Sequence, residues 1–76
     1  MNEKIKNIFV SVLDVQKEKI MEETSMDDIP EWDSLAHVSL VSAIEEEFDI
    51  NMSMDEITSM LSVKNAIEIV SDQLNN

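Results

Sequence analysis

The sequence predicts an all-α protein, a small bundle of three longer helices and one short helix. Apolar residues recur at three- and four-residue spacing in separate stretches, as they do on the buried face of amphipathic helices. Serine, aspartate or asparagine stands directly before these stretches, where side chains cap the free N–H groups of a first helical turn. Because the chain has 76 residues, we expect one domain, residues 1–76, with a modest core.

The first helix is expected over residues 3–13, with Asn2 as its cap. Its apolar stripe consists of Ile5, Ile8, Phe9, Val12 and Leu13. From residue 14 to residue 33 the helical pattern gives way to charged and turn-forming residues, which predicts a long loop between the first and second helices. Isolated apolar residues such as Ile20 and Ile29 are expected to anchor this loop to the core.

The second helix is expected to start at Ser34, with Asp33 and Ser34 competing for the capping role. Taken alone, a serine at this position is ordinarily a cap, because its oxygen accepts a hydrogen bond from a free N–H of the first turn. One side of this helix presents Leu35, Val38, Val41, Ile44, Glu45 and Phe48, and Leu40 widens the apolar face.

Two further helices follow the second. Ser53 with Glu56 three residues later forms a capping box and predicts a short helix, and Ser62 is expected to cap the last helix. The short helix carries Ile57, Met60 and Leu61, and the last helix carries the stripe Val63, Ala66, Ile67, Val70 and Leu74. Methionine is adaptable packing, so ordinary core filling explains Met52, Met54 and Met60; alternatively they line a deformable cleft between the second and third helices.

Charge and composition exclude several classes of protein. The net charge of −12, from 17 acidic residues against 5 basic ones, repels nucleic-acid phosphates and anionic lipids, so partners are expected to carry basic patches. The absence of cysteine removes disulfides, thiolate zinc sites and thiol nucleophiles. The longest uncharged stretch, 35–44, is about half of the roughly 20 residues that cross a bilayer. We therefore expect a soluble, cytoplasmic monomer that binds neither nucleic acid nor membrane.

A catalytic alternative exists at Ser34, because His37 lies one helical turn after it. A serine hydrolase also needs an orienting acid and an oxyanion hole, and no glycine-rich elbow precedes this serine. The hydrolase hypothesis is therefore disfavoured. His37 is expected to be a partly exposed surface residue or, as a second choice, a partner contact. A calcium site is disfavoured too, since no acidic loop has the ligand spacing and turn glycine of an EF-hand.

The run Trp32-Asp33-Ser34-Leu35, followed by Ile44-Glu45-Glu46-Glu47-Phe48-Asp49-Ile50, resembles the acyl carrier proteins. The Asp-Ser-Leu tripeptide alone has low specificity, but it stands here at the right separation from the Glu-Glu-Glu-Phe helix ending, in a chain of the right length and charge. The resemblance extends through the short third helix to the final helix, which begins Ser62-Val63-Lys64-Asn65-Ala66-Ile67. It covers nearly the whole chain.

The resemblance implies that Ser34 is an attachment point and not a nucleophile. In this family a phosphopantetheinyl transferase moves 4'-phosphopantetheine from coenzyme A onto the serine, and the thiol of the arm holds an acyl or aminoacyl group as a thioester. The chain would then be a non-catalytic carrier. A helix N-terminus favours the anionic phosphodiester by roughly 0.3 to 1 kcal/mol when exposed. The alternative is an acidic helical adaptor or regulatory module that is not modified.

The resemblance also implies docking residues and partners. Partner enzymes, namely an acyl- or aminoacyl-loading ligase and downstream acyl-transfer enzymes, are expected to contact Asp33, Leu35, Glu45, Glu46 and Glu47. Leu35, directly after the serine, is expected to face outward on the second helix. Carriers of fatty acid synthesis typically read Asp-Ser-Leu-Asp-x-Val-Glu-Leu, and here Ala36 and Ser39 replace the two later acids. The run from Ile29 to Leu35 looks like stand-alone carriers of specialised pathways. Trp32 is expected to pack on the bundle or, alternatively, to shield the arm or contact a partner.

Overall fold

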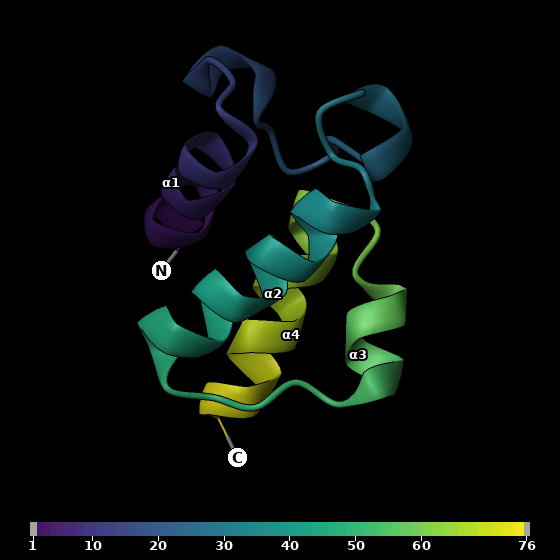
Figure 1. Cartoon of the computed structure of the whole chain (residues 1–76). Helices are drawn as coiled ribbons and strands as arrows, with labels where there is room; N and C mark the ends of the chain where they lie inside the picture. Colours follow the sequence, from purple (N-terminus) through teal and green to yellow (C-terminus); the bar gives the residue numbers. More distant parts are fainter. Residues whose placement is uncertain (1, 76) are drawn as a thin grey trace.

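The structure, a computed structural model, describes residues 2–75. Its regular elements are helices, and several are joined by long connections (Figure 1). Its elements in chain order are α1 (Asn2–Leu13), η1 (Lys17–Lys19), η2 (Met26–Asp28), α2 (Ser34–Phe48), α3 (Met54–Ser59) and α4 (Val63–Leu74), where η denotes a 3-10 turn. Within residues 2–75 this confirms the predicted bundle of three longer helices and one short helix. Asn2 is the first residue of α1 and not its cap, and α3 ends before Met60 and Leu61.

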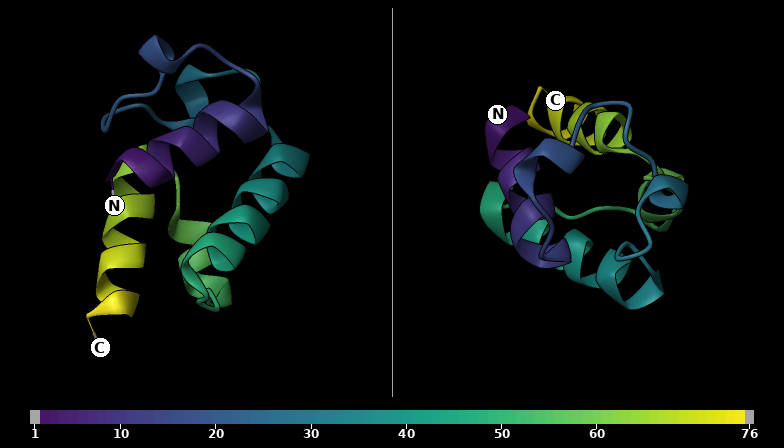
Figure 2. Two further views of the ribbon diagram at one scale, coloured as in Figure 1. Left: turned by 90° about the vertical axis from the view of Figure 1, so that its left-hand side faces the viewer. Right: turned by 90° about the horizontal axis from the view of Figure 1, so that it is seen from above.

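The core lies where α1 packs against both α2 and α4, and the views of Figure 2 show these helices from the side and from above. Its buried apolar residues are Ile5, Phe9, Leu13, Ile20, Ile29, Trp32, Leu40, Val41, Ile44, Met52, Met60, Val63, Ala66 and Val70. The predicted stripe residues are therefore buried or partly buried, apart from Leu35, Val38, Leu61 and Leu74. Val38 and Leu74 were expected on buried faces and are exposed, because the helices carry more apolar residues than a core of this size can cover. Leu61 was expected on the short helix and is also exposed, and it lies in the connection between α3 and α4.

Hydrogen bonds to the α3–α4 connection order the long loop between α1 and α2. Backbone N–H groups of Met26, Val63 and Lys64 donate to carbonyls of the opposite segment at 2.9 to 3.0 Å. An isolated antiparallel bridge pairs Ser25 with Ser62. The loop is thus held by backbone pairing to a segment almost forty residues away in the chain.

Side chains of the loop add to this ordering. Ile20 and Ile29 are buried, which confirms that they anchor the loop to the core. Thr24 is buried as well, and its hydroxyl accepts a hydrogen bond from the N–H of Met21 and donates one to the carbonyl of Lys19. These contacts position the end of the loop at the start of α2.

The η1 turn is tied to α1 by an exposed ion pair. Lys17 Nζ donates a hydrogen bond to Glu3 Oε2 at 3.0 Å. The hydrogen bond and the positive charge of Lys17 lower the pKa of the Glu3 carboxyl below its ordinary value.

Within residues 2–75, no helix combines the length and the apolar composition needed to cross a membrane.

Helices α1 and α2 both end at an aspartate in the left-handed region, Asp14 with φ 54° and Asp49 with φ 53°. After Asp49, the N–H of Ile50 returns to the carbonyl of Glu45 at 3.1 Å, the hydrogen bond of a Schellman motif. Glycine usually fills this position because it has no Cβ to clash, and the chain contains no glycine. Aspartate also places a negative charge at the negative end of the helix.

We expect Asp49→Gly to raise the free energy of unfolding by about 1 kcal/mol. Glycine relieves the left-handed backbone strain and removes the charge repulsion, and together these gains exceed the free-energy cost of glycine's greater conformational entropy in the unfolded chain. Urea unfolding followed by circular dichroism measures the change. Asp49→Asn is the matched control, because it removes the charge and keeps a side chain at φ 53°. Equal gains for both variants would assign the effect to charge alone, and a loss in Asp49→Gly would contradict the prediction.

Candidate functional site

The site begins at the first residue of α2, Ser34. Asp33 caps this helix: its Oδ1 accepts a hydrogen bond from the N–H of Ala36 at 2.9 Å, and its carbonyl accepts one from the N–H of His37 at 2.8 Å. The structure thereby decides between the two candidate caps in favour of Asp33. Ser34 is exposed, and its hydroxyl makes no hydrogen bond within residues 2–75. The serine is therefore open to chemistry from outside.

The backbone around Ser34 suits a negatively charged group. The N–H groups of Ser34 and Leu35 have no hydrogen-bond partner among the described residues, since the Asp33 cap takes up those of Ala36 and His37. Free N–H groups at the positive end of a helix favour an anion. A phosphodiester formed on the Ser34 hydroxyl would stand next to them, so the residues present fit a phosphopantetheine arm.

Trp32 precedes α2 by two residues, and its side chain is 2% exposed. Its ring meets Phe9 edge-on, with centroids 5.0 Å apart and an angle of 74° between the planes. The indole Nε1–H donates a hydrogen bond to Nδ1 of His37 at 3.0 Å. The expected packing of Trp32 on the bundle is confirmed, and a side chain this buried does not shield an arm in solvent.

His37 connects the loop to α3. Nδ1 accepts from the Trp32 indole, so Nε2 must carry the proton, and it donates to the carbonyl of Ile57 at 2.8 Å. We call this set of contacts the Trp32–His37–Ile57 bridge. The ring is partly exposed, as expected, and both of its nitrogens have hydrogen-bond partners within the protein. Neither nitrogen is available to activate Ser34, which removes the basis of the hydrolase hypothesis.

Apolar side chains are exposed around the serine. Leu35 is 81% exposed and Val38 is 64% exposed. Leu35 and Val38 are three residues apart and so lie on the same face of α2. The outward direction of Leu35 was expected, whereas Val38 was assigned to the buried stripe from its spacing. Exposure of Val38 was not readable from the sequence, because α2 has apolar residues on both faces.

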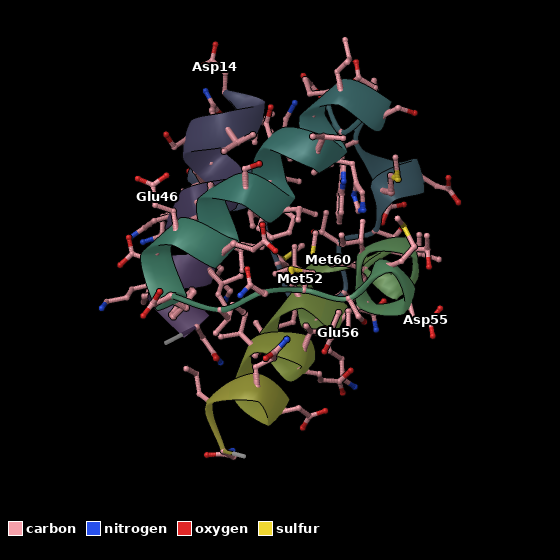
Figure 3. The ribbon with its side chains drawn as sticks, turned by 60° about the horizontal axis from the view of Figure 1, so that its bottom comes forward. Asp14, Glu46, Met52, Asp55, Glu56 and Met60 are labelled. Atoms are coloured by element: carbon pink, nitrogen blue, oxygen red, sulfur yellow. The ribbon has the colours of Figure 1, made fainter. Side chains whose placement is uncertain are left out.

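The three acids at the end of α2 have different surroundings. Glu45 Oε2 accepts a hydrogen bond from the N–H of Met52 at 2.8 Å and so fastens the α2–α3 connection. Glu47 lies 3.9 Å from Lys4 Nζ, and Glu46 is exposed, as Figure 3 shows. Glu46 and Glu47 are exposed, whereas Glu45 is half-buried.

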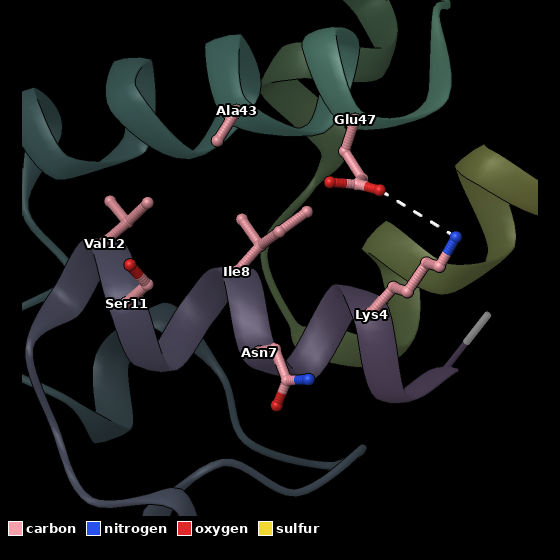
Figure 4. Close-up of a pocket in the computed structure, with 7 residues that line it drawn as sticks. All are labelled: Lys4, Asn7, Ile8, Ser11, Val12, Ala43 and Glu47. Atoms are coloured by element: carbon pink, nitrogen blue, oxygen red, sulfur yellow. Dashed lines mark ion pairs between the residues drawn. The ribbon is translucent and has the colours of Figure 1, made fainter.

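The three methionines considered for a cleft do not share one environment. Met52 and Met60 are buried and lie in the interior in Figure 3, whereas Met54 is exposed. Core packing therefore explains the first two. The structure has a shallow groove elsewhere, of about 280 Å³, between α1 and α2 (Figure 4). It is lined by Lys4, Asn7, Ile8, Ser11, Val12, Ala43 and Glu47, and so lies away from Ser34.

Glu45 and Glu46 offer a matched pair of variants. We expect Glu45→Ala to lower the free energy of unfolding by about 1 kcal/mol, because the half-buried N–H of Met52 loses its partner. Glu46→Ala is expected to leave stability within about 0.5 kcal/mol of wild type. Urea unfolding followed by circular dichroism measures both, and equal losses would contradict the assignment of Glu45 to the α2–α3 connection.

The structure is an acidic helical bundle in which an exposed serine, Ser34, begins α2. Comparisons with known proteins identify the class: the family model described as "Phosphopantetheine attachment site" matches residues 3–71. An acyl carrier protein of Buchnera aphidicola is 37% identical to this chain over 73 residues, which cover 96% of this chain and 91% of the Buchnera protein. The chain belongs to the acyl carrier protein family.

Two solved structures agree with this assignment. The holo acyl carrier protein of Geobacter metallireducens has a TM-score of 0.86 and 28% identity, covering 97% of this chain and 85% of its own. That of Nitrosomonas europaea has a TM-score of 0.86 and 29% identity, with coverages of 99% and 96%. The protein is thus a non-catalytic carrier of acyl groups on covalent 4'-phosphopantetheine, and it interacts with a phosphopantetheinyl transferase and acyl-handling enzymes.

Proposed function

We propose that Ser34 is the residue that carries the phosphopantetheine arm. The observation that carries this proposal is that Asp33 caps α2, so that the Ser34 hydroxyl is exposed and has no hydrogen-bond partner among the described residues. Two other serines at helix starts differ, because Ser53 and Ser62 use their hydroxyls to accept capping hydrogen bonds. Their oxygens are engaged in holding the fold.

Attachment at Ser34 is a single displacement at phosphorus. The Ser34 oxygen forms the new bond to the pantetheine-bearing phosphorus of coenzyme A, the bond to the nucleotide phosphate breaks, and the nucleotide part leaves. The hydroxyl proton passes to the transferase, because no described residue of this chain offers Ser34 a base. The chain contributes an accessible nucleophilic oxygen and two free N–H groups that suit the phosphodiester. Once attached, the arm supplies the thiol that holds the cargo.

The surface around Ser34 supports docking through both shape and charge. Leu35 and Val38 present an apolar face beside the serine, while Ala36 and Ser39 carry no charge. No lysine or arginine occurs between Lys19 and Lys64, whereas most of the acidic residues do. Partners with a basic patch would be attracted to this surface, in encounters that are fast and sensitive to salt. Among the acids, Glu46 and Glu47 act in docking and Glu45 in holding the fold.

We assign the cargo to a specialised pathway. A ligase that activates an amino acid, a hydroxy acid or an unusual acyl group would load the arm. The support is the departure of the Ser34 surroundings from the charged pattern of fatty-acid-synthesis carriers, at Ala36 and Ser39.

Intact-mass measurement tests the attachment. Apo protein is incubated with coenzyme A and a broad-specificity phosphopantetheinyl transferase, and the expected result is a gain of one arm. Fragmentation of the peptide that contains α2 then locates the added mass on one residue. The proposal predicts Ser34, and no mass gain, or mass on another residue, would contradict it.

A further inference from the structure

Helix α3 is the least buried helix of the bundle. It has six residues, and none of its side chains is buried. The helices whose backbones approach each other closely are α1 with α2 and α1 with α4, and α3 takes part in neither pair. A six-residue helix has no stability of its own in water. Within the described residues, α3 is therefore held in place by a small number of specific contacts.

Two side chains from neighbouring helices supply such contacts. His37 of α2 donates a hydrogen bond to the carbonyl of Ile57 at 2.8 Å. Gln73 of α4 donates from Nε2 to Glu56 Oε1 at 3.0 Å and to the carbonyl of Asn51 at 2.7 Å. Because α3 ends at Ser59, the Ile57 carbonyl is one of the free carbonyls of a helix C-terminus, and His37 satisfies it.

The hydrogen bond from His37 to Ile57 depends on a contact with the buried Trp32. Trp32, itself packed on Phe9, donates to Nδ1 of His37 and so leaves the proton on Nε2, in the tautomer that can donate to Ile57. The Trp32–His37–Ile57 bridge therefore runs from the core through the first turns of α2 to α3. Ser34 lies between Trp32 and His37 in the chain, so the bridge joins the two ends of the segment that contains the proposed attachment site.

An apolar cargo on Ser34 would gain from entering the core, since burial of hydrocarbon is favourable in proportion to its area. The interior is already occupied: Ile44 and Met60 are fully buried and Val41 nearly so. On its other side, α2 is closely packed by α1. A chain that enters beside Ser34 must therefore move α3 away from α2, which breaks the hydrogen bond between His37 and Ile57.

We propose that His37 is a positioning residue that determines cargo specificity: by holding α3 against α2 it closes the core to apolar chains, so that the cargo stays in solvent. This inference rests on the proposed attachment at Ser34. A cargo that stays in solvent suits short, polar acyl groups, such as an amino acid or hydroxy acid, because these lose nothing by remaining hydrated. Long alkyl chains are the cargo that this arrangement disfavours.

Two variants of His37 separate its two hydrogen bonds. Asparagine keeps an acceptor at the position of Nδ1 for Trp32 but does not reach Ile57. Glutamine places a donor at the position of Nε2 and keeps the bond to Ile57. Wild type, His37→Asn and His37→Gln are each loaded with an acetyl-arm or an octanoyl-arm, using the matching acyl-coenzyme A and the transferase, and intact mass confirms loading. Cleavage of the thioester by hydroxylamine then reports whether the cargo is in solvent.

We expect wild type and His37→Gln to release octanoyl and acetyl groups at rates within about twofold of each other. In His37→Asn the octanoyl group is expected to be released about fivefold more slowly than acetyl. Loss of one ordinary hydrogen bond raises the population with the octanoyl group inside the core by about this factor, and the thioester is protected there. Protection of octanoyl in wild type, or its absence in His37→Asn, would overturn the proposal.

A second measurement needs no arm and so separates this inference from the proposed function. Amide hydrogen exchange in unmodified protein is expected to be about fivefold faster in α3 of His37→Asn than in wild type, and unchanged in α4. Unchanged exchange in α3 would show that the bridge does not hold this helix. Failure of every variant and wild type to gain mass would contradict attachment at Ser34 and leave the exchange result to decide on the bridge.

Discussion

Ser34→Ala is expected to abolish attachment of the arm completely while leaving the fold intact. Loss of the Ser34 oxygen removes the only atom proposed to form the phosphodiester. Stability should change by less than about 0.5 kcal/mol, because this exposed side chain makes no hydrogen bond within residues 2–75 and the cap is Asp33. Intact mass after incubation with coenzyme A and transferase measures attachment, and urea unfolding measures stability.

Two control variants isolate the role of this one oxygen. Ser39→Ala removes another exposed serine of α2 and is expected to gain the arm as wild type does. Asp33→Ala removes the cap, so it should lower the free energy of unfolding by about 1 kcal/mol while still gaining the arm at completion. Attachment that persists in Ser34→Ala, or disappears in Ser39→Ala, would refute the assignment.

Trp32→Ala is expected to lower the free energy of unfolding by about 3 to 5 kcal/mol, the usual cost of deleting a large buried ring. The ring contact to Phe9 is lost, and His37 Nδ1 loses its donor. A chain of this size is stable by only a few kcal/mol, so a large fraction of the variant should be unfolded in water. Circular dichroism during urea titration measures the shift.

Trp32→Phe is the matched control for this prediction. Phenylalanine keeps an aromatic ring near Phe9 and lacks the indole N–H, so the half-buried Nδ1 of His37 is left without its donor. The expected cost is smaller, about 1 to 3 kcal/mol. A loss below about 1 kcal/mol in Trp32→Ala would show that the bundle tolerates removal of the ring and would contradict its place in the core.

Local patterns predicted much of the fold. The three stripes located α1, α2 and α4, and the capping box of Ser53 and Glu56 located the start of α3, where both of its hydrogen bonds are present. These signals depend on residues three or four positions apart, which a helix brings together whatever the rest of the chain does. The same patterns failed at Val38, because helical spacing shows which residues share a face but not which of two apolar faces is covered.

The site was predicted in part. The position of Ser34 at the start of α2 followed from the sequence, as did the outward direction of Leu35. Whether Asp33 or Ser34 would cap the helix did not follow, because both residue types are good caps and one residue decides where the helix begins. The structure assigns the cap to Asp33, and this assignment leaves the serine free.

By itself, the sequence determined the helices, their approximate ends and the serine that begins α2, because each depends on interactions within one or two turns. Only the tertiary structure decided the roles of His37 and Glu45. Their partners lie 20 residues away, at Ile57, and seven residues away, at Met52, across turns of the chain. No periodicity encodes such contacts, since they exist only after packing has brought separate helices and loops together.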